Sequence, residues 1–225
     1  MAFQKSFLKL EGTVDGLSIY QSNDRYIVRK KSGVSGDRIK NDPAYVRARE
    51  NMLEFGRSGK AAKLIRVAFR LQIADIADNG FTPRLVQTLM RIIKSDTVNE
   101  RGQRDLLGGD TSELLNLEFN AGKSLTQIMH ASFISSIDRS TGSQTVEVPA
   151  FIPSEKLSKP DGATHFRLFA TAAELDFDAD KHVSATMTSG DLVIGSKEET
   201  AKLVCRLPEA SKKMLLLAFG IQFGR

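Results

Sequence analysis

Two glycine-lysine motifs contain residue types that bind phosphate in nucleotide-binding loops. Gly122-Lys-Ser124 offers a lysine and a hydroxyl, but the position five residues before its glycine, where such a loop needs another glycine, is Leu117. Gly56-Arg-Ser-Gly-Lys60 has Glu54 at that position and no hydroxyl after its lysine. The first motif is therefore interpreted as a turn between strands. In the second, glycines three residues apart favour close helix packing or a break in a helix.

Carboxylates at alternate positions of Asp176-Phe-Asp-Ala-Asp180 match the first half of a calcium-binding loop. An EF-hand would need glycine at position 181 and glutamate at position 187, where the chain has Lys181 and Met187. The alternation with Leu175 and Phe177 instead predicts a strand that ends in a solvated acidic turn. Calcium binding by this loop is left open as the alternative.

The remaining candidates for catalysis or metal binding are three histidines and one cysteine. No two of His130, His165 and His182 have the spacing of metal ligands. Cys205 lies in Leu203-Val-Cys-Arg-Leu207, where alternation places it on one face with two leucines and predicts a buried structural thiol. The sequence has no Gly-x-Ser-x-Gly and no His-Glu-x-x-His motif. We therefore expect no enzymatic activity, no metal site and no cofactor.

The composition is that of an ordinary globular protein. Of 225 residues, 41% are hydrophobic and 26% are charged, which excludes general disorder and coiled-coil rods. No apolar run approaches the ~18 residues of a membrane span, and residues 1–11 lack the apolar core of a signal peptide. We expect a cytoplasmic location, with export without a leader left open.

Positive charge is concentrated in the first half of the chain. Residues 1–105 contain 20 Lys and Arg against 12 Asp and Glu, whereas residues 106–225 contain 12 against 15. Within residues 25–70 the ratio is 13 to 4. Such a basic face binds nucleic acid or an acidic protein surface, including the acidic half of a second copy. Composition alone does not choose between these partners.

The first half of the chain predicts a hairpin followed by helices. The strand formers of Gly16–Tyr20 and Arg25–Arg29 flank a turn-type cluster at 21–25. Asn41-Asp42-Pro43 is a helix start, because Asp42 can cap free amides and proline suits the first helical position. Gly56 and Gly59 predict a break upstream of an amphipathic stretch. The predicted helices cover Ala61 to Ala77, Thr82-Pro83 to about Lys94, and a short piece at 98–107.

The second half of the chain predicts short strands separated by turn signals. The candidate strands are Leu115–Asn120, Ile134–Asp138, Thr145–Pro149, His165–Ala170, Leu175–Phe177, Leu192–Ile194, Lys202–Leu207 and Met214–Phe223. This pattern is typical of an immunoglobulin- or fibronectin-III-like β-sandwich. The predicted fold class is therefore α+β, with a hairpin and a basic helical region in residues 1–110 and the sandwich in residues 111–225.

Several stretches are similar to a known group of proteins. They are Gly12-Thr-Val-Asp-Gly-Leu-Ser-Ile-Tyr20, Tyr26-Ile-Val-Arg-Lys-Lys31, Asn41-Asp-Pro-Ala-Tyr-Val-Arg-Ala-Arg-Glu-Asn-Met-Leu-Glu-Phe-Gly56, Arg101-Gly-Gln-Arg104 and Gly162-Ala-Thr-His-Phe166. The chain resembles a family of uncharacterised bacterial proteins that combine an N-terminal hairpin and an Arg-Glu-Asn helix with a β-rich C-terminal half. The resemblance covers most of the chain and implies no function.

The sequence favours a non-catalytic structural or interaction protein that assembles with copies of itself or with a larger bacterial machine. In this hypothesis the hairpin adds a strand to the sheet edge of a neighbour. The self-association candidates are Leu17, Ile19, Tyr20, Tyr26 and Val28. The alternative is sequence-nonspecific nucleic-acid binding by the basic helix at 43–78, although such a stripe also describes the solvated face of an ordinary amphipathic helix. Its candidate residues are Arg47, Arg57, Lys60, Lys63, Arg66 and Arg70.

Overall fold

The computed structural model describes residues 2–4, 9–30, 33–115 and 117–224 of the protein. The chain divides into two compact units, unit 1 (Met1–Arg49) and unit 2 (Glu50–Arg225). Helix α2 (Val46–Ala68) begins in unit 1 and continues into unit 2. The predicted domain boundary between residues 110 and 111 falls inside unit 2.

Unit 1 contains a four-stranded antiparallel sheet in the order β1-β4-β3-β2. Its strands are β1 (Ala2–Phe3), β2 (Gly12–Val14), β3 (Leu17–Ser22) and β4 (Arg25–Lys30). Two-residue turns join the last three strands, and their φ angles are positive: 46° and 77° at Asp15-Gly16, 47° and 60° at Asn23-Asp24. Asp, Asn and Gly tolerate this left-handed backbone, which matches the twist of a hairpin. The predicted hairpin is confirmed, whereas β1 and β2 are additions to it.

Helices follow the sheet: α1 (Gly36–Asn41), the 3-10 helix η1 (Pro43–Tyr45) and α2. Asp42 Oδ1 accepts a hydrogen bond from the Ala44 amide at 2.9 Å, and Pro43 takes the first helical position of η1. The first amides of a helix have no acceptor within the helix. Proline has no amide hydrogen, so it needs no acceptor there, and the Asp42 carboxylate accepts the amide of Ala44. The predicted helix start is therefore confirmed.

α2 is one continuous helix, so the break predicted at Gly56 and Gly59 is wrong. The helix ends at Ala68 instead, and Phe69, with a φ of −106° and a ψ of 24°, separates it from α3 (Arg70–Ile76). Each glycine costs a helix about 1 kcal/mol relative to alanine. The buried side chains of the same helix outweigh this cost: Ala61, Ala62, Leu64, Ile65 and Ala68. A Cβ added at either glycine meets no atom of the described residues within 4 Å, so the glycines do not serve close packing.

The other helices of unit 2 are α4 (Phe81–Ser95), η2 (Thr111–Leu114), α5 (Leu125–Ile128) and α6 (Pro153–Lys156). α4 matches the helix predicted to end near Lys94 and buries its apolar stripe, Leu85, Leu89, Ile92 and Ile93. Gly122-Lys-Ser124, where a turn between strands was expected, leads directly into α5. Ser124 caps α5, because its hydroxyl accepts the Gln127 amide while the Gln127 side chain accepts the Ser124 amide.

The short helix predicted over 98–107 is wrong, because this stretch forms turns around the buried carboxylate of Asp96. Asp96 accepts hydrogen bonds from the amides of Val98, Asn99 and Asp105 and from the Asn99 side chain, at 2.8 to 3.1 Å. These hydrogen bonds, that of the Asn99 side chain first, hold the pKa of Asp96 well below its ordinary value. The backbone donors that a helix would use internally are directed at one side chain instead.

Unit 2 contains seven strands among its described residues. They are β5 (Ile134–Asp138), β6 (Ser143–Phe151), β7 (His165–Asp176), β8 (Lys181–Thr188), β9 (Leu192–Val193), β10 (Glu199–Arg206) and β11 (Met214–Gly224). The strands predicted at 165–170 and 175–177 are the two ends of β7, and the other predictions from 134 onward are confirmed. β8 was missed, although Val183, Ala185 and Met187 alternate with polar residues as in a strand with one apolar face.

The strand predicted at Leu115–Asn120 is wrong in the part that the structure describes, which leaves out residue 116. Phe119 packs its ring against the ring of Phe81, with the centroids 4.7 Å apart, and against Phe69 at 6.0 Å. Leu117 and Phe119 therefore pack against the core of the helical layer, whereas Leu115 is 72% exposed. They do not form one face of a sheet.

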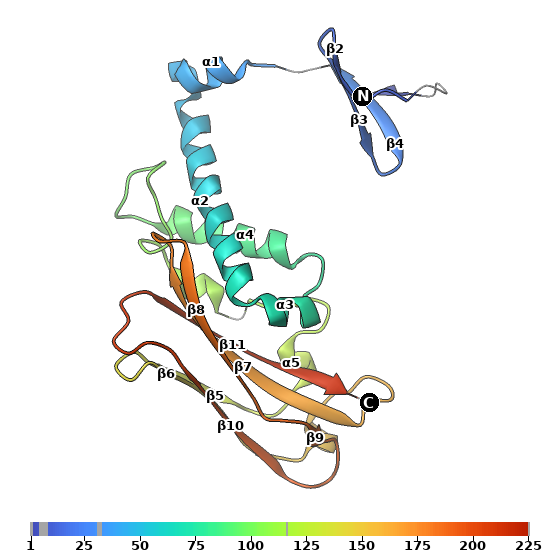
Figure 1. The fold of residues 1–225 in the computed structure, drawn as a ribbon, viewed down its shortest axis with the longest axis vertical. Coiled ribbons are helices and arrows are strands. Elements are labelled where there is room, and N and C mark those ends of the chain that lie inside the picture. Colours follow the sequence, from blue (N-terminus) through green and yellow to red (C-terminus); the bar gives the residue numbers. More distant parts are fainter. Residues whose placement is uncertain (1, 5–8, 31–32, 116, 225) are drawn as a thin grey trace. The chain divides into compact units, whose positions relative to one another are not determined.

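β7 is the central strand of unit 2 and is buried on both faces. On one face, Ala173 and Leu175 share a hydrophobic core with α2 and α4. On the other, the side chains share a second core with β6 and β10: Phe166, Leu168, Ala170 and Ala172. Figure 1 shows α2, α3 and α4 on one side of the sheet β11-β7-β8 and the sheet β10-β6-β5 on the other. The helices and all three antiparallel sheets confirm the α+β class.

Candidate functional site

The sheet of unit 1 has one predominantly apolar face. Directly paired residues of antiparallel strands point to the same side of a sheet. The register pairs Val14 with Leu17 and Ile19 with Val28, and it places Tyr26 two residues from Val28 on the same side. We call these five residues the apolar face of unit 1. Four of the five predicted self-association residues therefore lie together on this face.

Tyr20, the fifth predicted residue, lies on the opposite face, because it pairs with Ile27. Phe3 is on that side too, and the Arg25 guanidinium lies 5.8 Å from its ring centroid. β3 and β4 are inner strands, since β2 pairs with β3 and β1 pairs with β4. β1 and β2 therefore already pair with part of each edge that the predicted hairpin would offer to a neighbour.

Unit 1 is short of burial and rich in positive charge. None of its described residues is buried, and Val14 and Leu17 are 57% and 42% exposed. Residues 1–49 contain 10 Lys and Arg against 5 Asp and Glu, whereas residues 50–225 contain 22 of each kind. The whole net charge of +5 therefore belongs to unit 1. The charge difference between the two units, +5 against 0, is smaller than the difference of +8 against −3 between residues 1–105 and 106–225.

Four of the predicted phosphate-contacting residues are exposed on α2 and α3 and form what we call the basic patch: Lys60, Lys63, Arg66 and Arg70. None of the four makes an ion pair or a side-chain hydrogen bond within the described ranges of the chain. Four solvated cations along a helix can contact phosphates, and the same arrangement also describes a solvated helix face.

Arg57 does not belong to the basic patch. Its Nη1 donates hydrogen bonds to the carbonyl oxygens of Gly102 and Arg104, at 2.6 and 3.2 Å, and Nη2 donates to Gln103 Oε1 at 3.2 Å. Beside it, the buried Glu54 accepts the Gly102 amide at 2.9 Å. Arg57 and Glu54 therefore hold a distant turn against α2. Arg47 is exposed in the first turn of α2, within unit 1.

α2 also exposes apolar side chains that the sequence interpretation missed. Met52, Leu53 and Phe55 are 64%, 52% and 61% exposed. The predicted amphipathic stretch began at Ala61, so the sequence interpretation did not predict which side chains of the earlier part of the helix are buried. The signal in the sequence is the run Met52-Leu-Glu-Phe55, in which only the glutamate turns out to be buried.

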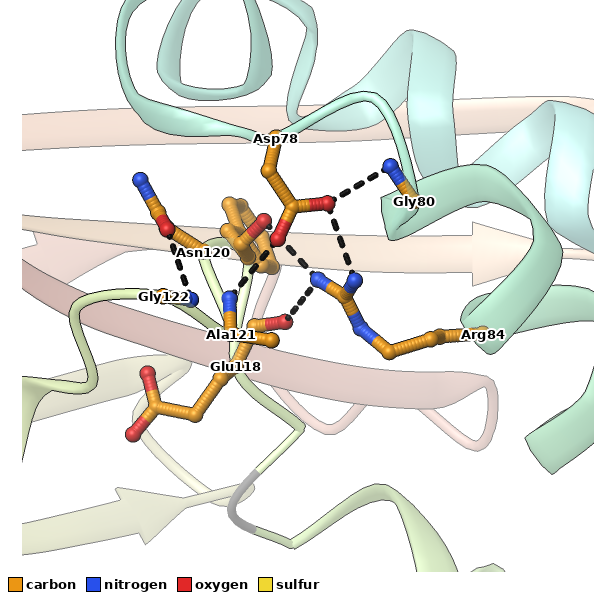
Figure 2. A network of polar contacts seen from close by, with 8 residues as sticks. Asp78, Gly80, Arg84, Glu118, Asn120, Ala121 and Gly122 are labelled. Atoms are coloured by element: carbon orange, nitrogen blue, oxygen red, sulfur yellow. Dashed lines mark hydrogen bonds and ion pairs between the residues drawn. The ribbon is translucent and has the colours of Figure 1, made fainter.

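Asp78 and Arg84 form a polar cluster, which we call the clamp, that joins α4 to the loop at residues 118–121. Figure 2 shows Asp78 in this cluster, where Oδ1 accepts from the Gly80 amide at 2.7 Å and from Arg84 Nη1 at 2.9 Å, and Oδ2 accepts from the Ala121 amide at 2.8 Å. Arg84 Nη2 donates to the carbonyl oxygens of residues 118 and 119, both at 3.2 Å. The Arg84 hydrogen bond, then the Ala121 amide, lowers the pKa of Asp78 to about 2. Both side chains are used to fasten a loop to α4.

The acidic turn after β7 is held by hydrogen bonds to Asp176. Asp176 Oδ1 accepts from the amides of Asp178 and Ala179, at 3.2 and 2.9 Å, which confirms the predicted strand end. Lys213 Nζ lies 3.1 Å from Asp176 Oδ2 and 3.5 Å from the buried Glu174. Asp176 raises the pKa of Lys213, while the Ala179 amide and Lys213 lower the pKa of Asp176. Of the described residues, no three His, Cys, Asp or Glu gather closely enough to hold a metal ion.

The histidines and the cysteine occupy separate places. His130 Nε2 contacts Ser158 Oγ at 3.1 Å, and His165 Nδ1 contacts Thr164 Oγ1 at 2.8 Å. Cys205 is buried in the second core, and its thiol donates to the Ala170 carbonyl at 3.3 Å. Burial raises the pKa of this thiol, which disfavours the nucleophilic thiolate. The predicted buried structural thiol is confirmed.

Comparisons with protein families, with curated proteins and with solved structures found no match to this chain. The resemblance to an uncharacterised bacterial family therefore stays a prediction. In the described part of the chain, no helix has both the length and the apolar character needed to cross a membrane. The cytoplasmic location also stays a prediction.

Proposed function

We propose that the protein is a non-catalytic structural or interaction protein that assembles with copies of itself through the apolar face of unit 1. The observation that supports this proposal is that no described residue of unit 1 is buried. A small sheet gains about 25 cal/mol for each Å² of apolar surface removed from water, and without a covering layer it is only marginally stable. A second copy of the same face supplies that layer in a two-fold arrangement.

The charge of unit 1 predicts how salt affects this assembly. Each unit 1 carries 10 basic against 5 acidic residues, so two copies placed face to face repel each other. Salt weakens this repulsion, because exposed charges more than a Debye length apart, about 8 Å at physiological ionic strength, are largely screened from each other. Face-to-face assembly therefore strengthens as salt is added. Head-to-tail contact between a basic and an acidic surface would weaken instead.

The test is the mass in solution, measured by light scattering after size exclusion on nuclease-treated protein at low and high salt. Val14→Asp places a charge on the apolar face, whereas Thr13→Asp places the same charge on the opposite face of the same strand, since Thr13 pairs with Ser18. We expect an oligomer for the wild type and for Thr13→Asp, and a monomer for Val14→Asp. A wild type that is monomeric at every concentration and salt, or two variants that behave alike, would contradict the proposal.

We also propose a specific fold for unit 2. An immunoglobulin- or fibronectin-III-like sandwich in unit 2 is supported by two antiparallel sheets that contribute to one core. Such sandwiches commonly serve in adhesion and assembly, an argument by fold analogy. Membership of a larger bacterial machine is proposed on the same basis.

A second candidate function is sequence-nonspecific nucleic-acid binding by the basic patch, because its four cations are exposed without ion pairs in the described ranges. Each phosphate contact makes affinity fall with salt. We expect replacement of all four by alanine to weaken binding to a mixed-sequence DNA and to flatten the salt dependence. The matched control removes four exposed lysines elsewhere: Lys156, Lys181, Lys197 and Lys212. Equal effects of the two quadruple variants would rule out this candidate.

A further inference from the structure

A cleft of about 540 Å³ lies along the C-terminal half of β11 in unit 2. Six consecutive residues of this strand, 219–224, line it, and their side chains alternate between the two faces of the sheet. A cavity lined by both faces of one strand lies along that strand's edge. The opposite wall comes from the end of α3 and the segment that leads into α5: Asp75, Ile76, Glu118, Asn120, Lys123 and Leu125. Clefts of roughly 300–1,000 Å³ are the size that holds ligands.

The edge that lines this cleft is unusually open to another strand. β7 is the one strand that pairs with β11 in the described residues, and eleven pairs run in unbroken register from Met214↔Leu175 to Gly224↔His165. β11 contains no charged residue and no proline. Natural edges are usually blunted by charges, prolines or bulges, as β10 is by Lys202 and a register shift after Glu199. Alternate N–H and C=O groups of β11 point away from β7, towards the free edge of the strand.

We propose that this cleft binds one extended segment of a partner polypeptide, which adds to β11 as an antiparallel or parallel strand. Main-chain hydrogen bonds to the edge give such complexes their affinity, and pockets for alternate side chains give them specificity. The partner segment presents apolar side chains towards Phe219, Ile221 and Phe223, which are only partly buried. This binding site lies on unit 2, and the apolar face that we propose for self-assembly lies on unit 1. Peptide binding at the cleft therefore does not depend on self-assembly.

The charges around the cleft favour a segment that carries lysine or arginine. Asp75 Oδ2 accepts from the neutral Gln222 side chain at 2.9 Å, and Glu118 accepts from the Leu125 amide at 3.2 Å. Neither carboxylate forms an ion pair within the described residues. On the other rim, Arg167 and Asp191 neutralise each other at 2.8 Å. Lys123 is thus the single lining cation outside an ion pair, against two carboxylates.

The two walls of the cleft also decide against a second copy of β11 as the occupant. That strand is covered on both faces by the layers of its own unit 2 and is joined to its own β7. Besides β11 and the segment from Glu118 to Leu125, the cleft is lined by Phe166, Arg167 and Asp191, and a space enclosed in this way admits a single strand without these layers. The occupant is therefore an extended segment of another polypeptide.

Binding is tested on the full chain with two synthetic peptides of alternating valine and threonine that differ in one central residue, lysine or glutamate. Fluorescence anisotropy gives the affinities, and hydrogen exchange locates the bound segment. We expect the lysine peptide to bind saturably, to slow amide exchange within 219–223, and to bind at least about tenfold more tightly than the glutamate peptide. Saturable binding of neither peptide, or protection confined to another strand, would overturn the proposal.

Two double variants test the charge argument. Asp75→Asn with Glu118→Gln removes both cleft carboxylates and should abolish the preference for lysine. Glu155→Gln with Asp161→Asn removes two exposed carboxylates of unit 2 outside the cleft and should leave the preference unchanged. An unchanged preference in the first variant would overturn the charge argument. Amide protection of 219–223 that rises with protein concentration alone would identify a second copy as the occupant and overturn the partner segment. Val14→Asp should bind both peptides as the wild type does, which separates this result from self-assembly.

Discussion

Unit 1 and unit 2 keep their sheets folded in different ways. In unit 1, two turns with left-handed residues define the strands, yet no described side chain is buried. In unit 2, β7 is covered on both faces by cores that join residues far apart in the chain. Turn chemistry is therefore enough to set strand register, but it does not remove apolar surface from water. A sheet made in the first way depends on contacts from outside itself, and a sheet made in the second way does not.

The largest expected difference between the units comes from truncating one leucine in each. Leu168 is fully buried on β7, whereas Leu17 on β3 is 42% exposed. Leu168→Ala leaves a cavity in the second core and should lower the free energy of unfolding by about 2–5 kcal/mol. Leu17→Ala should change it by less than about 0.5 kcal/mol at a concentration where the protein is monomeric. Urea unfolding followed by circular dichroism measures both, and equal losses would contradict the contrast between the units.

The parts of the fold that the sequence predicts are those decided by neighbouring residues. The turn at Asn23-Asp24, the cap at Asp42 and the alternation around Cys205 each act within a few residues, and each is confirmed. The segment 98–107 was mispredicted because the neighbouring Asp96 and the distant Glu54 and Arg57 fix its backbone. The segment 115–120 was mispredicted because Phe119 packs on aromatic rings far away in the chain. Asp15-Gly16 was a recognisable turn signal for the extra strand β2, which is too short to show a pattern of its own.

The candidate site divides along the same line. Alternation alone implies that Ile19 and Tyr20, as adjacent strand residues, point to opposite faces, so the apolar face of unit 1 was largely within reach of the sequence. Helical spacing placed Arg57 with the basic patch. Its guanidinium instead binds carbonyl oxygens more than forty residues away, which no local pattern reveals. The cleft beside β11 also needs tertiary structure, because α3, the 118–128 segment and β11 meet only in the fold.

Acid should weaken the long-range clamp of unit 2. The pKa of Asp78 is lowered from 3.8 to about 2 in the folded protein, so its stabilising contribution is complete above pH 4 and is lost as the pH falls towards 2. Asp78→Asn puts an amide donor where two backbone amides and Arg84 also donate. We expect a lower melting temperature at pH 7, by less than for Leu168→Ala, and a flatter decline between pH 4 and pH 2.

The control for this variant is Asp161→Asn in an exposed loop of the same unit. It should melt like the wild type at both ends of the pH range. If the melting temperature of Asp78→Asn falls with acid as steeply as that of the wild type, Asp78 titrates normally in the folded protein. The clamp then does not fasten the loop.

Among the described residues, two side chains of unit 2 have buried polar atoms without a hydrogen-bond partner, Arg104 at Nε and Gln144 at both amide atoms. Gln144 on β6 is fully buried, and neither its Oε1 nor its Nε2 has a hydrogen-bond partner among the described residues. Leaving such groups unpaired costs stability, and an apolar side chain of similar shape avoids the cost. Gln144→Met should therefore raise the free energy of unfolding by about 1 kcal/mol. Urea unfolding checks this, and a loss of stability would show that the amide is satisfied in solution.

The smallest expected effect concerns the glycines of α2. At Gly56 and Gly59 an added Cβ meets nothing within 4 Å in the described structure, and alanine is the better helix former. Each Gly→Ala variant should stabilise unit 2 by roughly 0.5–1 kcal/mol, measured by urea unfolding. A loss of stability at low concentration would mean that something packs closely on these glycines within one chain. If the variants unfold later but assemble less, the glycines keep this helix face open for a neighbour, and the contrast between the two units narrows: unit 2, although folded without help, would then also contribute a surface to the assembly.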